Sequence, residues 1–433
     1  MSAGVPVAVI RRLWQQRFSP EAWLLASNLL SRLLGFVVSL LVSRMAGVQA
    51  LGVYSGLLIT AASPTTPVSA VLANNATILS ARHHGQVQLR TLLRAQLPVW
   101  LLGLLFAAFG CVLMLHASSL LGSASLPWAM VLWVMAGLVV GQMLTHLVVG
   151  LYHGADLSVR ASIVSSVTAI IALTSTYPVI QYWGLHGILV QATLVAMVPG
   201  LLMCWMAWRD DELITPSSSA VDLRDESRAQ FRQAWPNVLA TVLNNGTNWL
   251  ACIYLAERFH GHAGLGVVAI SLQWMALMQL PVSSWAGRVM RALSLGHAEG
   301  ANSFGREIGR QVRRCAWVSL AGGVGVVAVA PWVADVYRVD RVTLFWMLAI
   351  NALATVLAGI NVVYERVFFC LGTQRPWLCF SILAYAVQLV VTWMLIPHAI
   401  QAVAVGNLMA SVAVMVGVTW YLWRRGYLAR SFR

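Results

Sequence analysis

The chain alternates long apolar stretches with short polar ones, a pattern typical of a protein that crosses a membrane many times. A transmembrane helix needs about 20 apolar residues at about 1.5 Å per residue. Twelve stretches reach this length, at approximately 22–43, 51–74, 95–116, 127–150, 160–182, 185–208, 234–257, 264–288, 314–334, 342–364, 377–397 and 400–423. The sequence therefore predicts an all-α polytopic membrane protein with about twelve transmembrane helices.

The longest polar stretch, 209–233, separates six spans from six. It carries Asp210, Asp211, Glu212 and Pro216, a composition typical of a loop. We therefore predict an N-lobe over 1–208, a cytoplasmic linker over 209–233 and a C-lobe over 234–433.

The two predicted lobes are related by an internal repeat. When residues 43–83 are compared without gaps to the residues 214 positions later, 13 of 41 are identical. The matched pairs include Arg44/Arg258, Gly52/Gly266 and the Pro-Val-Ser triplets that begin at Pro67 and Pro281. Each half has an even number of spans, so the repeats run parallel about an axis along the membrane normal. Two such lobes around a central cavity that opens to either side form a transporter architecture.

The charge of the chain is explained by topology. Of 433 residues 59% are hydrophobic and 10% charged, and the net charge is +14. All 28 basic residues are Arg; 23 fall in segments on the side of the N-terminus, and four (Arg44, Arg258, Arg338 and Arg341) fall in loops on the other. Basic residues favour the cytoplasmic side. The pattern predicts that both termini are cytoplasmic, and it excludes nucleic-acid binding as the reason for the charge.

The remaining basic residue, Arg32, lies within the first span, near the membrane midplane. It belongs to a polar stripe of one helical face, formed by Asn28, Arg32, Gly35, Ser39 and Ser43. Insertion of a charge at this depth costs about 2.5–3.5 kcal/mol, so such a residue faces the bundle interior with a partner. No acidic residue lies clearly at mid-membrane. We therefore expect an anionic ligand, and the planar fork of Arg suits phosphate.

Two further interpretations accompany this stripe. Arg32 could instead form a structural ion pair, or bond carbonyls freed by Pro64 or Pro67. The first span of the second half carries a matching stripe that includes Asn244 and Asn248, and the two stripes are expected to line the cavity.

Charged and kinked positions near the span ends are candidates for gating and coupling. Glu257 and Arg258 end the seventh span and Arg288 ends the eighth, which suits a charged gate or substrate path, or ordinary interfacial anchors. Glu365 is the carboxylate best placed for H⁺ or Na⁺ coupling; the alternative driver is the membrane potential. Pro67 and Pro281 are candidate hinges, or static kinks. No metal-ligand spacing or cofactor motif is present, and the six scattered Cys form no CxxC pair.

The segments Ser31-Arg32-Leu33-Leu34-Gly35-Phe36, Ser43-Arg44-Met45-Ala46-Gly47 and Leu51-Gly52-Val53-Tyr54 resemble those of a known family. They are similar to the multidrug/oligosaccharidyl-lipid/polysaccharide (MOP) exporter superfamily, and specifically to the Wzx-type polysaccharide flippases. Gly150-Leu151-Tyr152-His153-Gly154 and the Trp423-Arg424-Arg425 ending also fit.

This resemblance implies a V-shaped bacterial inner-membrane flippase. Such a protein moves an undecaprenyl-pyrophosphate-linked oligosaccharide, the repeat unit of an O-antigen, exopolysaccharide or capsule, from the cytoplasmic to the periplasmic leaflet. The implied partners are this glycan, membrane lipids and a polymerase or co-polymerase. Arg32 matches the first-span Arg that related lipid II flippases use near pyrophosphate. The chain departs from them with Val37-Val38 in place of an Arg-Asp pair and with twelve spans, not fourteen.

Two other function classes fit the sequence less well. A multidrug exporter of the same superfamily expels organic cations and is expected to keep a carboxylate inside a lobe, which the sequence does not offer. An intramembrane enzyme of glycan assembly is expected to carry a long outer loop or an acidic motif. The longest outer loop, about 117–126, has neither acid nor base, and no Ser-His-Asp arrangement emerges. The sequence therefore favours a transporter over an enzyme.

Overall fold

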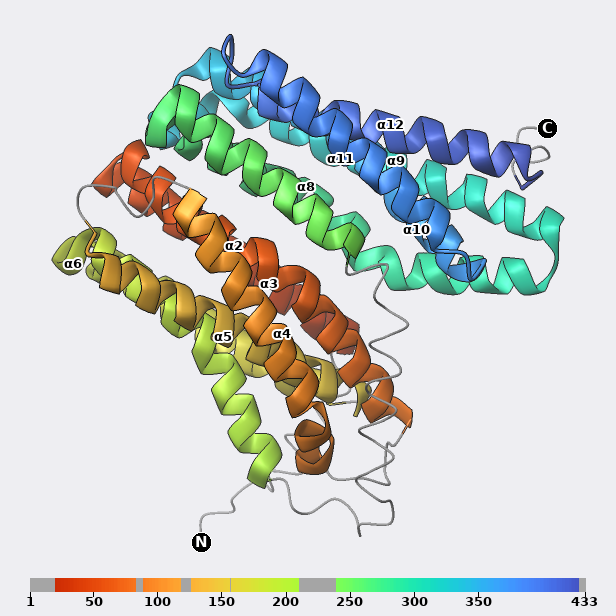
Figure 1. Ribbon diagram of the computed structural model, residues 1–433, viewed down its shortest axis with the longest axis horizontal. Coiled ribbons are helices and arrows are strands. Elements are labelled where there is room, and N and C mark those ends of the chain that lie inside the picture. The colour runs from red at the N-terminus through yellow and green to blue at the C-terminus, as the bar shows by residue number, and fades with distance from the viewer. Residues whose placement is uncertain (1–19, 83–88, 118–125, 156, 210–238, 428–433) are drawn as a thin grey trace, which may run out of the picture. The chain divides into compact units, whose positions relative to one another are not determined.

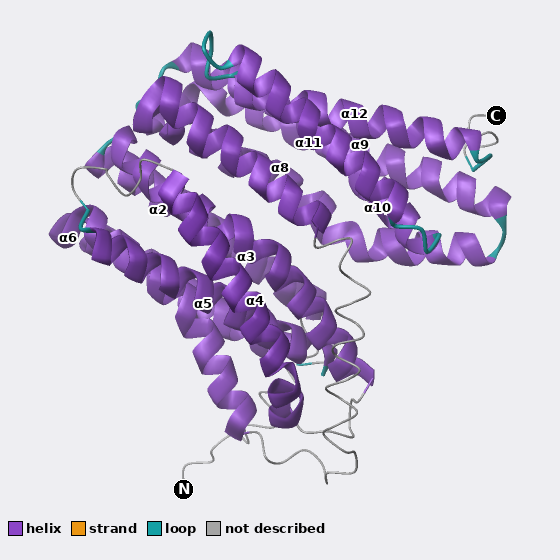
Figure 2. Ribbon diagram, viewed as in Figure 1, coloured by secondary structure: helices purple, strands orange, loops and turns teal. Residues whose placement is uncertain are grey.

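The computed structural model describes residues 20–82, 89–117, 126–155, 157–209 and 239–427. These residues are helical nearly throughout, and none of them is in a β-strand (Figure 2). The predicted linker 209–233 and the predicted outer loop 117–126 lie almost entirely outside the described residues.

Long helices make up the described chain (Figure 1). In order they are α2 (Pro20–Ala46), α3 (Val48–Arg82), α4 (Leu89–Ala117), α5 (Trp128–Gly154), α6 (Ser158–Arg209), the π-helix η2 (Leu250–Leu255), α8 (Ala256–Ala298), α9 (Ala301–Tyr337), α10 (Arg341–Cys370), α11 (Arg375–Leu395) and α12 (Ala402–Arg424). Residues 239–249, before η2, are also helical. The all-α prediction is confirmed.

Ten helical runs in the described residues are long and apolar enough to cross a membrane, and two of them are double. The backbone of α6 breaks at Gly184 (φ 56°) and that of α8 at Gly261 (φ 65°). Glycine adopts positive φ at little cost because it lacks a Cβ. Dividing the runs 158–209 and 239–298 at these glycines gives twelve segments, which match the twelve predicted spans. The chain is a multi-pass membrane protein.

The described chain forms two compact units, each with its own core. The first comprises residues 1–38, 68–108 and 132–233; the second comprises 39–67, 109–131 and 234–433. The boundaries cut through α2, α3, α4 and α5, because the ends of these helices pack with the second half of the chain. The predicted lobes, 1–208 and 234–433, are a different division based on the repeat and stay a prediction.

Apolar side chains fill the interior of each unit and also cover its surface. In the first unit the core includes Leu79, Leu147 and Tyr152, packed where α3, α4 and α5 meet. In the second, α10 packs against α8, α9 and α12, and its buried core includes Phe304 and Phe368. Many Trp, Leu and Val side chains are exposed, as expected for helices whose outer faces contact lipid rather than water.

Candidate functional site

Arg32 lies twelve residues into α2, about 18 Å from the start of the helix. Its side chain is exposed, like those of Leu29, three residues before it, and Leu33, next to it in the chain. Within the described part of the chain, no carboxylate or carbonyl forms a hydrogen bond or ion pair with its guanidinium. The group is therefore available to a ligand.

The polar stripe continues along α2 into a contact with α8 and α9 of the same compact unit. Ser39 is fully buried, and its hydroxyl donates to Oε1 of Gln273 at 2.6 Å and pairs with the Tyr337 hydroxyl at 3.1 Å. One turn on, the Ser43 hydroxyl donates to the Tyr337 carbonyl at 2.9 Å. In this conformation Ser39 belongs to a packed contact and does not line an open cavity.

Arg44 completes this contact at the end of α9. Its Nε donates to the Val336 carbonyl at 2.8 Å. The last carbonyls of a helix lack intrahelical partners and carry partial negative charge. Ser43 and Arg44 satisfy two of them, so α2 caps the C-terminal end of α9, where Arg338 adopts a left-handed conformation. We call Ser39, Ser43 and Arg44, with Gln273, Val336 and Tyr337, the α2–α9 contact.

Two repeat-related glycines form a second contact, between α3 and α8. A Cβ at Gly52 would collide with the carbonyl oxygen of His262, and a Cβ at Gly266 would lie 2.5 Å from the carbonyl oxygen of Val48. Residues 48 and 52 differ from 262 and 266 by 214, the offset of the sequence repeat. Within the second unit, α3 and α8 therefore cross symmetrically at these glycines, backbone against backbone. We call these four residues the glycine crossing.

A third link joins α3 to the helical segment before η2. The indole N–H of Trp249 donates to the Thr60 hydroxyl at 3.0 Å, and both residues are buried. The backbone then passes into the π-helix η2 (Leu250–Leu255), a rare conformation that is frequent at functional sites. This seventh span is therefore irregular where it contacts the first half of the chain.

Predicted stripe residues of the second half lie in an amide cluster between helices. Asn248 Nδ2 donates to Asn244 Oδ1 at 3.0 Å. Gln388 of α11, itself buried, donates to Asn248 Oδ1 at 2.8 Å and to Asn407 Oδ1 of α12. Asn244 and Asn248 are half-buried. These neutral groups satisfy one another, and we call the four residues the amide cluster.

The predicted gating charges lie near the break at Gly261. Glu257 approaches His262 Nδ1 at 3.5 Å, so the pair spans the break. Arg258 is exposed and donates to the Tyr254 hydroxyl at 3.3 Å, one turn before it. Glu257 is thus next to the glycine crossing, whereas the described contact of Arg258 is with its own helix turn.

The predicted coupling residue Glu365 is half-buried near the end of α10. It lies close enough to Tyr385 of α11 to interact electrostatically, and Ser381 hydrogen-bonds that tyrosine. The adjacent Arg366 places its guanidinium 5.5 Å from the ring centre of Phe369. Among the described residues, no group of three or more His, Cys, Asp or Glu is arranged to hold a metal ion.

The predicted hinges lie within continuous helices. Pro67 is buried in α3 and Pro281 is exposed in α8. The non-helical residue of α8 is Gly261, twenty positions before Pro281. The side chains of Asn28 and Arg288 lie outside the described ones, although both backbones are helical.

Several residues of these contacts were missed by sequence reasoning. Gln273, Tyr337, Gln388 and Asn407 all bond across helices, yet none belongs to a charged pair or a repeated motif. Amides inside predicted spans were the available signal for Gln388 and Asn407, since buried amides need partners. Tyr337 offered none, because it lies at a span end, where Tyr is common.

Solved structures of other proteins share this fold. No family model matches the chain, and no curated protein matches it in sequence. Among solved structures, an inward-facing multidrug resistance MATE family transporter of the MOP superfamily superposes with a TM-score of 0.75 at 15% identity, over 92% of this chain and 96% of that one. The lipid II flippase MurJ, in an inward closed conformation, superposes with a TM-score of 0.67 at 13% identity, over 94% of this chain and 89% of that one.

A MOP superfamily transporter from Pyrococcus furiosus is described as having a binding pocket of reverse polarity. It superposes with a TM-score of 0.64 at 15% identity, over 95% of this chain and 97% of that one. At these identities the similarity concerns the fold alone. The chain has the all-helical fold of MOP superfamily transporters, the MATE proteins and MurJ among them.

Proposed function

We propose that the protein is a flippase that carries an undecaprenyl-pyrophosphate-linked oligosaccharide from the cytoplasmic to the periplasmic leaflet of the bacterial inner membrane. The observation that carries this proposal is Arg32, a cation at membrane depth without a partner among the described residues. An unpaired charge at this depth marks a substrate path. The fold, shared with a lipid II flippase and with MATE transporters, supports movement of a lipid-like substrate.

Arg32 is assigned to the pyrophosphate. A guanidinium offers two parallel N–H donors to phosphate oxygens, and the bonds are charge-assisted. Polar residues of the same stripe, Asn28 on the preceding turn among them, are assigned to the first sugars. Asn244, Asn248 and Arg288 are the corresponding candidates of the second half.

Alternating access requires the halves to separate at one end, and the described contacts suggest how. The α2–α9 contact and the glycine crossing join the first half of the chain to the second, and both lie at the end that the Arg distribution predicts to be periplasmic. For substrate to leave there, Ser39 must break its hydrogen bonds to Gln273 and Tyr337 and form new ones to water or to sugar hydroxyls. We therefore assign these contacts, with Glu257 and Arg258 beside them, to the outer gate.

The decisive experiment is leaflet-resolved detection of labelled substrate. Purified protein is reconstituted in vesicles with fluorescent undecaprenyl-pyrophosphate oligosaccharide, and a membrane-impermeant glycosidase reports which leaflet holds the sugar. We expect the wild type to equilibrate the label and Arg32→Ala to lose this activity. Arg424→Gln is the matched control, because Arg424 is an exposed arginine whose contact among the described residues is with Trp420 of its own helix. Normal flipping by Arg32→Ala would contradict the pyrophosphate assignment.

Coupling is assigned to Glu365, with H⁺ or Na⁺ as the cation. The carboxylate is half-buried within electrostatic reach of Tyr385 and Arg366, so protein replaces part of its hydration, and a cation that binds there does so against the charge of Arg366. Glu365→Gln is expected to abolish uphill transport driven by an imposed ion gradient while downhill exchange of substrate persists. If transport by the variant responds to the ion gradient as transport by the wild type does, Glu365 is not the coupling residue, and the membrane potential is assigned as the driving force for transport.

A second candidate function is export of amphiphilic drugs, which the similarity to a MATE transporter favours. Export of organic cations requires a carboxylate in the substrate path, whereas Arg32 repels a cation. The two functions are separated by testing ethidium efflux in the same vesicles. Efflux that depends on Glu365 and is unaffected by Arg32→Ala would favour the exporter.

A further inference from the structure

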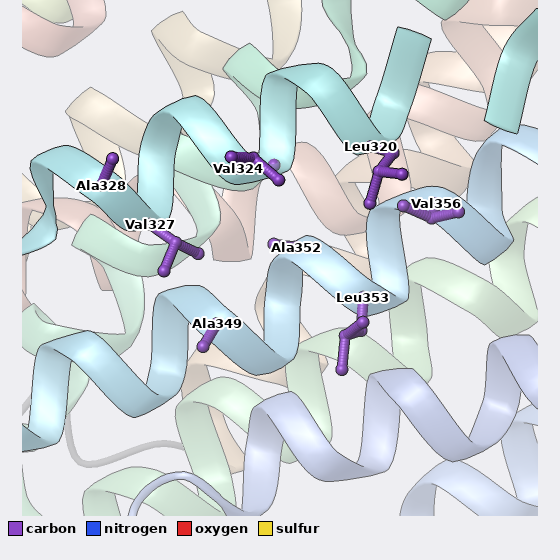
Figure 3. A pocket seen from close by; sticks show the side chains of 9 residues that line it. Leu320, Val324, Val327, Ala328, Ala349, Ala352, Leu353 and Val356 are labelled. Carbon is purple, nitrogen blue, oxygen red and sulfur yellow. The ribbon is translucent and has the colours of Figure 1, made fainter. Parts of the chain in front are cut away.

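An apolar groove runs along the surface of the second unit between α9 and α10 (Figure 3). Its volume is about 470 Å³. Aliphatic side chains and one glycine form the whole lining, which consists of Leu320, Gly323, Val324, Val327, Ala328, Ala349, Ala352, Leu353 and Val356. Val324 and Leu353 are more than half exposed, so the groove opens on the outside of the bundle.

Residue sizes explain why a groove forms here. A Cβ at Gly323 would lie 3.0 Å from the Cβ of Ala352, so the two helices meet closely at that point. Small residues, Ala328 and Ala349, leave space at one end, and Leu320 and Val356 form the walls at the other (Figure 3). From Leu320 to Ala328 the groove extends about 12 Å along α9. The groove is therefore elongated, and its shape suits a flexible hydrocarbon chain better than a compact ligand.

One end of the groove continues into a basic face of the same helix. Arg306, Arg313, Trp317, Leu320 and Val324 follow at intervals of 7, 4, 3 and 4 residues, so they share one face of α9. Trp317 is 69% exposed, and both arginines are exposed. Along this face of α9 the two arginines are therefore followed by the ring of Trp317 and then by the apolar groove.

The two arginines are available to an anion. Arg306 has no hydrogen bond or ion pair with any described residue. The contact of Arg313 is a long bond, 3.4 Å, from Nε to the Gly309 carbonyl of its own helix. The nearby carboxylate, Glu307, is already engaged by Arg310 at 2.9 Å and by Gln311.

We propose that this face is a binding site for an anionic phospholipid of the membrane, with the phosphate on Arg306 and Arg313 and one acyl chain in the α9–α10 groove. Charge complementarity selects the occupant. By the positive-inside pattern the arginines lie at the cytoplasmic surface, where anionic headgroups gather and attract basic side chains. The predicted span begins at 314, so Trp317 is expected at the level of the interface, the usual depth of Trp. The site is independent of the substrate path proposed for Arg32.

The test uses phosphatidylglycerol that carries a photoreactive diazirine in its acyl chain, mixed with the full-length protein in phosphatidylcholine nanodiscs. Mass spectrometry of the crosslinked peptides locates the chain. We expect crosslinks within 317–328 and 349–356, and several-fold fewer when the same diazirine chain is carried by phosphatidylcholine. Each arginine near a membrane surface changes affinity about fivefold. Arg306→Gln combined with Arg313→Gln should therefore weaken crosslinking by tenfold or more.

Two further variants separate the site from general lipid contact. Arg424→Gln removes an exposed arginine at the same predicted membrane surface and is expected to leave crosslinking unchanged. Ala349→Phe fills the groove and should remove the crosslinks while Arg306 and Arg313 remain. Equal labelling by the two lipids, or an equal loss in Arg424→Gln, would refute the site. Displacement by undecaprenyl pyrophosphate at low mole fraction, but not by excess phosphatidylglycerol, would overturn the assignment to a phospholipid.

Discussion

Arg32 and Arg44 lie twelve residues apart on α2, and their surroundings differ. Arg44 donates to the Val336 carbonyl at the end of α9, next to Ser43, which donates to the Tyr337 carbonyl. Arg32 contacts no carboxylate or carbonyl among the described residues. One cation thus completes a helix end, whereas the other is left for a ligand. The comparison shows that the later part of α2 packs against α8 and α9, whereas the guanidinium of Arg32 has no such contact among the described residues; the binding surface at Arg32 is our proposal.

The largest effect should come from Arg32. An Arg–pyrophosphate fork supplies two charge-assisted hydrogen bonds at about 1.5–3 kcal/mol each, so Arg32→Gln should slow flipping about 100-fold or more. Arg32→Lys keeps the charge but loses the fork, and it should recover only part of the rate. The measurement is the initial rate of substrate translocation in vesicles at equal protein content.

Arg44→Gln is the matched comparison on the same helix. It removes a capping bond of the kind worth about 1 kcal/mol, so the flipping rate should fall by a few-fold at most. Equal losses in the Arg32 and Arg44 variants would show that both arginines are structural, and the division of α2 into a contact and a binding surface would fail.

The next largest effect is expected at the glycine crossing. Gly52→Val and Gly266→Val place side chains against the carbonyls of His262 and Val48, so they should prevent the close approach of α3 and α8. We expect about a tenfold loss of transport and greater labelling of an engineered cysteine near the crossing by a water-soluble maleimide. Gly325→Ala is the control, because nothing lies within 4 Å of its added methyl group. Equal labelling in the wild type and Gly52→Val would show that the crossing does not close this end.

The sequence predicted helix number and breaks well because both depend on local properties. Bilayer-length apolar runs located twelve segments, and the short gap between the spans predicted at 160–182 and 185–208 contains Gly184, where α6 breaks. The repeat offset of 214 by itself pairs Gly52 with Gly266. Length was less predictable: α9 begins at Ala301, well before the predicted span at 314, because its first turns are amphipathic rather than apolar.

The contacts of the candidate site were harder to predict. Ser39 was recognised as polar and inward-facing, but its partners Gln273 and Tyr337 lie more than 230 residues away in the chain. No periodicity encodes such pairing, since it depends on how helices from the two halves meet. The prediction for Arg32 needed no such pairing. Its depth follows from the span boundaries, and a charge at that depth is costly unless it finds a partner. Its role in binding a ligand stays a prediction.

A smaller effect is expected from the hydroxyl pair within the α2–α9 contact. Tyr337→Phe removes one side of a bond worth about 0.5–1.5 kcal/mol, so it should shift the gate equilibrium two- to tenfold toward the open form. Ser39→Ala also removes the bond to Gln273 and should shift it further. Maleimide accessibility of a cysteine near Ser43 measures that shift. In a double-mutant cycle the combined variant should cost less than the sum of the single ones. Strict additivity would mean that the two hydroxyls do not interact in the closed form.

The smallest effect on transport should come from Gln388, a member of the amide cluster that is not assigned to the substrate and that bonds within the second half of the chain. Gln388→Leu removes the donor shared by Asn248 and Asn407 and leaves two amide oxygens without it. Interhelical hydrogen bonds in membranes contribute about 0.6 kcal/mol on average and about 1.7 at most. We therefore expect a fall of a few degrees in the melting temperature in detergent, with a flipping rate within about twofold of wild type. A large loss of transport in a protein of unchanged melting temperature would show that Gln388 takes part in substrate binding and not only in helix packing. Gln388 would then join Arg32 as a residue of the substrate path. Each half of the chain would contain both a packing contact and a binding surface, as we propose for α2.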